Sequence, residues 1–138
     1  MQLKKTVLLL PFLFFSTSAF ATGSGMSFWA EVIEAIIKVE SEGNTNAKSG
    51  IYVGPMQISP IMVKECNEIL KNKNKKDRFT LDDRYSLKKS KEMFRLFQEK
   101  YNPDRSIERA VRSWNGGPRF TIKSTNSYYK KVVAAMNN

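Results

Sequence analysis

The sequence predicts a mainly α-helical domain, in which about five short helices and a small irregular or hairpin lobe bound a cleft. Apolar residues recur at helical spacing in five segments. Breakers such as Gly116-Gly117-Pro118 separate those segments. The stretch from Asn44 to Ser59 lacks helical spacing, and its run Ile51–Val53 is expected to form a strand or hairpin turned by Gly50 and Gly54. A chain of 138 residues fits one such domain.

Each helix is predicted from an apolar stripe and from signals at its ends. The predicted helices span residues 28–41, 60–70, 86–101, 104 or 106 to 114, and 125–136. The first is expected to be largely buried, with Ser27 as its N-cap and Phe28 in its apolar stripe. Ser59-Pro60 opens the second helix, with proline in the first position. The buried stripe of the third helix is expected to include Leu87.

The N-terminus has the pattern of an export signal. Lys4 and Lys5 precede a short apolar run, and Ala19-Phe20-Ala21 is a small-residue cleavage site. We therefore expect a signal peptide over 1–21, a linker over 22–27 and the folded domain over 28–138. The expected location is the periplasm of a bacterium or the extracellular space. An uncleaved membrane anchor is the alternative, although the apolar run is short for a bilayer.

Composition limits the chemistry that the chain can perform. It has no histidine and a single cysteine, Cys66, which removes histidine-based triads, histidine–metal sites and a disulfide framework. No metal and no cofactor is therefore expected. Without the signal peptide, 21 basic and 13 acidic side chains leave a net charge of +8. This charge indicates an anionic partner, and export favours a cell-wall polymer or membrane surface over nucleic acid. A solvated basic surface, including the run at 71–78, is the simpler alternative.

Glu40 is the candidate catalytic residue. It lies in the last turn of the first, apolar helix. The negative end of the helix dipole and an apolar environment both disfavour an ionised carboxylate. A general acid needs this setting, because it must hold its proton near neutral pH.

Three sequence blocks carry a resemblance to a known family. The first block comprises Glu40-Ser41, Asn44, Ala47, Ser49, Gly54 and Met56–Pro60. The second comprises Ala110 and Trp114–Pro118, and the third comprises Thr125–Tyr128 followed by Lys130, Lys131 and Val132. These blocks resemble the lytic transglycosylase (SLT) domain, a relative of goose-type lysozyme, and they occur in that family's order and cover nearly the whole mature chain. The resemblance implies a lysozyme-like α+β fold.

The resemblance also implies a reaction and a site. The reaction is cleavage of the β-1,4 bond between N-acetylmuramic acid (MurNAc) and N-acetylglucosamine (GlcNAc) in peptidoglycan, leaving a 1,6-anhydro-MurNAc end. Glu40 matches the family's single catalytic acid and base. The matching substrate-binding positions are Ser49, Met56, Gln57, Trp114, Asn115 and Tyr128, and the tyrosine is the residue that contacts the catalytic glutamate. The expected partners are peptidoglycan strands, with the chain acting as a monomer, and an envelope-spanning secretion, conjugation or phage-related machine.

The chain departs from the family pattern at two places. The segment Gly50–Gly54 is one residue short, and Trp114 replaces a tyrosine. The indole keeps an aromatic face for sugar stacking and lacks the hydroxyl. Simpler interpretations also exist for three positions: Ser49 as a turn serine, Met56 as a core residue and Asn115 as a helix cap.

Two other functions remain open from the sequence. A hydrolytic muramidase needs a second carboxylate to activate water, and Asp82 or Asp83 is the candidate, with Glu42 a weaker one. The aspartates are better explained as a helix cap or as partners of Arg84. The other alternative is a non-catalytic module that binds the cell wall through its basic surface.

Overall fold

A computed structural model describes residues 28–138, and the expected signal peptide and linker lie outside the described residues. The described elements are α2 (Ala30–Ser41), β1 (Lys48–Ser49), β2 (Tyr52–Val53), α3 (Pro60–Asn72), the 3₁₀ helix η1 (Asp82–Tyr85), α4 (Leu87–Tyr101), α5 (Ile107–Gly116) and α6 (Ile122–Met136). The prediction of a mainly α fold with five principal helices and a small hairpin lobe is confirmed for this part of the chain.

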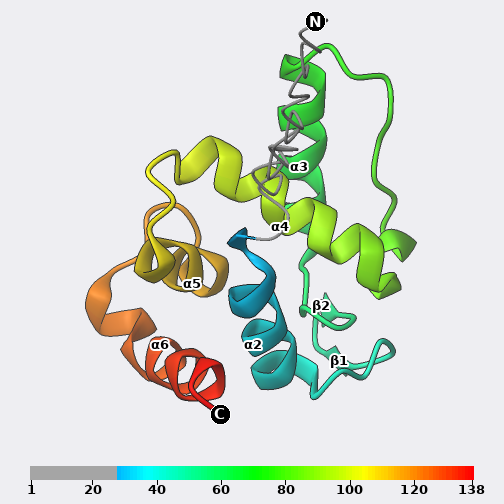
Figure 1. Cartoon of the computed structure of the whole chain (residues 1–138). Coiled ribbons are helices and arrows are strands. Elements are labelled where there is room, and N and C mark those ends of the chain that lie inside the picture. Colours follow the sequence, from blue (N-terminus) through cyan, green and yellow to red (C-terminus); the bar gives the residue numbers. More distant parts are fainter. Residues whose placement is uncertain (1–27) are drawn as a thin grey trace, which may run out of the picture.

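Helix α2 lies at the centre of the fold. It packs against α6 and α5 on one side, and the β1–β2 hairpin follows its C-terminal end on the other (Figure 1). Its side chains Ile33 and Ile36 are buried in the core. The rings of Trp29, Phe94 and Trp114 continue that core in edge-to-face contacts, with centroids 5.8 and 5.1 Å apart. Trp114 thereby connects the core to the region beside the hairpin.

Short polar side chains begin four of the helices. Ser59, Ser86, Ser106 and Thr121 each accept a hydrogen bond from a main-chain N–H in the first turn of α3, α4, α5 and α6, respectively. The cap at Thr121 explains why α6 starts at Ile122, three residues before the predicted start. Helix α2 begins at Ala30 without a side-chain cap, and Ser27 lies outside the described residues. Within residues 28–138, no helix is both long and apolar enough to span a bilayer.

Two residues predicted to be buried are exposed. Phe28 precedes α2, and 43% of it is exposed, with its ring against Trp29 at 4.7 Å between centroids. Leu87 is the first residue of α4 and is 41% exposed, because a side chain at the end of a helix has fewer neighbours to cover it. Both residues lie at helix ends, where the apolar periodicity alone does not predict whether a side chain is buried in the core.

The β1–β2 hairpin has a two-residue loop. Lys48 pairs with Val53 and Ser49 with Tyr52, which leaves Gly50 and Ile51 between the strands. Gly50 has φ +59°, the sign required at the first loop position of a type II′ turn. The shortened segment at this position therefore closes as a tight hairpin.

Candidate active site

Glu40 lies at the junction between the helical body and the hairpin lobe. It is half-buried in the last turn of α2. The next residue, Ser41, donates its hydroxyl to the main-chain oxygens of Ile37 at 3.2 Å and Pro55 at 2.8 Å. The second of these bonds joins the end of α2 to the turn beyond the hairpin. The position of Glu40 relative to the lobe is therefore fixed by its neighbour.

Burial raises the pKa of the Glu40 carboxyl, and the nearby Tyr128 hydroxyl opposes that shift. Burial, with a smaller contribution from the charge of Glu40, raises the pKa of Tyr128 well above its ordinary value. The Tyr128 hydroxyl is buried and has no hydrogen-bond partner among residues 28–138, so its contact with Glu40 is longer or less aligned than a normal hydrogen bond. Such contacts often shorten when substrate binds. The pair provides a neutral phenol beside an acid that tends to keep its proton.

A cleft of about 250 Å³ opens beside Glu40. Its lining residues are Glu40, Ser49, Tyr52, Gln57, Trp114 and Asn115. The structure thus brings together five of the seven residues predicted for the site. The lining is mostly polar, as suits a carbohydrate with many hydroxyl and amide groups.

Gln57 is held by the hairpin lobe. Its side-chain nitrogen donates to the main-chain oxygens of Ala47 at 3.2 Å and Gly54 at 2.9 Å. These bonds use the amide nitrogen and leave the amide oxygen free to accept a hydrogen bond. The backbone of Gln57 has φ +49°, a conformation uncommon outside glycine that is often found at functional sites.

Met56 differs from the prediction for the site. Its side chain is 0% exposed and belongs to the core, so it does not line the cleft. Its main-chain oxygen instead accepts a hydrogen bond from Trp114 Nε1 at 3.2 Å. Trp114 does line the cleft, although only 9% of it is exposed. The interpretation of Met56 as a core residue is the correct one in this structure.

The remaining predicted residues occupy distinct positions around the cleft. Asn115 is exposed in the last turn of α5, where the main-chain N–H of Gly117 closes the helix on Ser113 at 2.8 Å. The helix end therefore does not need the asparagine as a cap. Ser49, in β1, lines the cleft from the lobe. Tyr128 contacts Glu40 and is not among the lining residues.

The alternative carboxylates lie outside the cleft. Asp83 accepts a hydrogen bond from the main-chain N–H of Thr80 at 2.8 Å, while Thr80 accepts one from the N–H of Asp83, which is the reciprocal pattern of a helix cap. Asp82 is exposed on η1, and Glu42 lines a different hollow with Lys38. Among the described residues that line the cleft, Glu40 is the only carboxylate.

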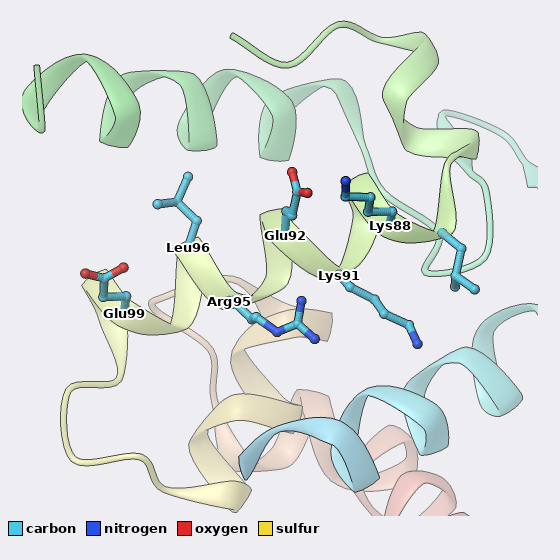
Figure 2. Close-up of a pocket in the computed structure, with 7 residues that line it drawn as sticks. Lys88, Lys91, Glu92, Arg95, Leu96 and Glu99 are labelled. Carbon is cyan, nitrogen blue, oxygen red and sulfur yellow. The ribbon is translucent and has the colours of Figure 1, made fainter. Parts of the chain in front are cut away.

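A larger hollow of about 590 Å³ lies along α4 (Figure 2). In the close-up, Glu92 and Leu96 project from one side of the helix, and Lys91 and Arg95 project from the other. The charged groups of Glu92, Lys91 and Glu99 already form ion pairs with neighbouring side chains. This hollow lacks an aromatic ring and does not include Glu40. Within residues 28–138, no group of three or more acidic or cysteine side chains is placed to hold a metal ion.

Sequence reasoning missed two features of the site. Tyr52 lines the cleft from β2, and the sequence offers no signal for it beyond its place in a short apolar run. Arg84 is 9% exposed and donates to the main-chain oxygens of Ile51, Ile58 and Leu81 at 2.8–3.2 Å. It fastens the hairpin lobe to η1, so the aspartates beside it belong to a structural segment.

The fold and this cleft together define the class of protein. A mainly helical body, a small hairpin lobe and one carboxylic acid at their junction form a lysozyme-like fold. Residues 18–137 match the sequence model of the transglycosylase SLT domain, and the chain belongs to that family. Searches of the curated proteins and of the solved structures returned no match. Membership indicates lytic transglycosylase activity, with peptidoglycan as the substrate class.

Proposed function

We propose that the protein cleaves the MurNAc-β-1,4-GlcNAc bond of peptidoglycan and leaves a 1,6-anhydro-MurNAc end, with Glu40 as both general acid and general base. The observation that carries this proposal is the isolation of Glu40. It is the one carboxylate among the described residues that line the cleft, and burial raises its pKa. A reaction that needs one carboxyl group in two successive roles suits this arrangement.

In the first step, the protonated Glu40 donates its proton to the glycosidic oxygen, and the bond from that oxygen to C1 of MurNAc breaks. The leaving strand departs with a free hydroxyl on GlcNAc. Positive charge develops at C1, and the acetamido group of the same MurNAc can stabilise it. Holding a proton near neutral pH is the requirement that the raised pKa of Glu40 meets.

In the second step, the Glu40 carboxylate takes the proton of the C6 hydroxyl, and the C6 oxygen bonds to C1 of the same sugar. Glu40 is protonated again and no water is consumed. Because the nucleophile is already part of the substrate, the site need not hold and orient a water molecule. The Tyr128 hydroxyl contacts Glu40, has no hydrogen-bond partner in the described part of the chain, and can donate to the carboxylate formed between the two steps.

Hydrolysis by a muramidase has weaker support. An inverting glycosidase places its second carboxylate across the scissile bond, where it activates water. Asp83 is engaged in a helix cap, and neither it nor Asp82 lines the cleft with Glu40. The two pathways differ in product mass, because the anhydro product is lighter by one water.

The test compares Glu40→Gln with the wild type on purified peptidoglycan, with Glu42→Gln as the matched control. Glu42 is two residues away and exposed, so its loss should not matter. Glu40→Gln removes the proton donor, and a loss of at least about 10²–10⁴-fold in cleavage rate is expected. Release of reducing ends only would contradict the anhydro mechanism. Equal activity of the two variants would contradict the role of Glu40.

The wall-binding alternative makes a different prediction. A binding module would sediment with peptidoglycan and release no fragments in any variant. The proposed enzyme should release fragments, and its Glu40→Gln variant should still sediment with the wall. Absence of fragments from the wild type would favour the module.

We further propose that the protein is exported and acts for an envelope-spanning machine. The support is the charged, apolar and small-residue pattern of residues 1–21, together with the small size of the domain. Mass spectrometry of the protein from fractionated cells tests export. A mature N-terminus near Thr22 in the periplasm or medium is expected, and a full-length chain in the cytoplasm would contradict it.

A further inference from the structure

Tyr52 is the most open aromatic side chain in the cleft. It is 49% exposed. Trp114, the other aromatic residue of the lining, is 9% exposed, and its ring packs edge-to-face on Phe94 and Phe97. The tryptophan therefore offers little surface to a ligand. An aromatic surface for substrate must come mainly from Tyr52.

The pairing of the hairpin directs Tyr52 into the cleft. Side chains directly opposite in an antiparallel pair lie on the same face, and successive side chains alternate between faces. Tyr52 is opposite Ser49, which also lines the cleft, while Val53 points the other way and is 3% exposed in the interior. Burial of Val53 thus fixes the face on which Tyr52 lies.

The backbone around Tyr52 is fixed by hydrogen bonds. The main-chain N–H of Gly54 bonds to Ala47 at 2.8 Å, and Val53 exchanges main-chain hydrogen bonds with Ile58. The guanidinium of Arg84 holds the loop between the two strands, because it donates to the main-chain oxygen of Ile51 at 3.1 Å. An exposed ring on a fixed strand loses little backbone freedom when it binds a ligand.

We infer that Tyr52 is a substrate-binding residue that packs its ring against a sugar of the glycan strand beside the bond at Glu40. This inference rests on the proposed function and deepens it. The face of an aromatic ring carries partial negative charge, and it attracts the weakly positive C–H groups on one face of a pyranose. The ligand class is a chain of N-acetylated hexosamines. Tyr52 takes the stacking role that the sequence assigned to Trp114.

The test measures binding separately from cleavage. The probe is a peptide-free hexasaccharide of alternating GlcNAc and MurNAc, titrated by calorimetry into the Glu40→Gln protein. Adding Tyr52→Ala should weaken binding about tenfold, whereas adding Tyr52→Phe should keep it within about twofold because the ring remains. The matched control is Ile51→Ala, since Ile51 is the adjacent residue, is 55% exposed and does not line the cleft. It should bind as the parent does.

Several results would overturn the inference. The first two are an unchanged affinity of the Tyr52→Ala protein and an equal loss of affinity in the Tyr52→Phe and Tyr52→Ala proteins. The others are an equal loss of affinity from Ile51→Ala and absence of binding by the Glu40→Gln parent. Thermal unfolding of each variant shows whether the hairpin is intact. In a second measurement with Glu40 present, Tyr52→Ala should raise KM for soluble glycan strands about tenfold and change kcat by less than about threefold. The proposed function fails separately, if wild type binds the hexasaccharide but forms no anhydro ends.

Discussion

Trp114 donates its indole N–H to the main-chain oxygen of Met56 at 3.2 Å. This bond joins α5, on one side of the cleft, to the turn that follows the hairpin on the other. It also gives the buried Met56 carbonyl its partner. The width of the cleft beside Glu40 therefore depends on a contact between residues 58 positions apart.

Trp114→Phe tests this connection. The variant keeps an aromatic ring in the core and leaves the Met56 oxygen without its donor, so the free energy of unfolding should fall by about 1–3 kcal/mol. Displacement of the cleft walls should lower kcat/KM about tenfold or more. Urea unfolding and fragment release measure the two effects. Trp29→Phe is the control: it removes a buried indole away from Glu40 and should preserve activity. Unchanged stability and activity in Trp114→Phe would show that the bond has no such role.

Tyr128→Phe tests the pairing of the phenol with the acid. The Tyr128 hydroxyl lowers the pKa of Glu40, so its removal should raise that pKa further. Because Glu40 must be protonated in the free enzyme, the alkaline limb of the kcat/KM profile should move to higher pH. Tyr129→Phe is the neighbouring control, since that ring packs under the Arg112 guanidinium at 4.2 Å and should keep the wild-type limb. A limb that stays in place or moves to lower pH in Tyr128→Phe would contradict the pairing.

The raised pKa of Glu40 also predicts how stability depends on pH. The folded protein binds the Glu40 proton more tightly than the unfolded chain does. The resulting stability is fully present below the unfolded pKa of about 4.5 and is lost as pH rises through the folded value. Glu40→Gln cannot ionise, so it should be more stable than the wild type at neutral pH and should lose that advantage in acid. Urea unfolding at several pH values checks this, and a wild type that is the more stable at neutral pH would refute it.

Gly54→Ala tests the close approach of the lobe to η1. Gly54 has φ +83°, and a Cβ there would lie 1.8 Å from the main-chain oxygen of Arg84. The positive φ and the steric clash should together lower the free energy of unfolding by about 3 kcal/mol. Gly43 has a similar φ of +84°, and a Cβ there would meet no described atom within 4 Å, so Gly43→Ala should cost only about 1 kcal/mol of backbone strain. Equal losses in the two variants, measured by urea unfolding, would exclude the steric contact.

The helices and Glu40 could be predicted because their signals are local. Apolar spacing and capping serines mark the helix positions, and the end of α2 marks where Glu40 falls. For Met56 the sequence allows both a cleft position and a core position, and the burial of its side chain decides for the core. Tyr52 was missed because its exposure depends on pairing across a two-residue loop. Arg84 reaches that loop from more than thirty residues away, which no local pattern reports.

The most direct test of the account is digestion of peptidoglycan in water enriched in the heavy oxygen isotope, followed by mass spectrometry of the fragments. Attack by the C6 hydroxyl consumes no water, so the new MurNAc ends should be one water lighter than reducing ends and should carry no isotope label. This product should disappear with Glu40→Gln and persist with Glu42→Gln. Labelled reducing ends as the initial product would contradict the account and would identify the enzyme as a hydrolase.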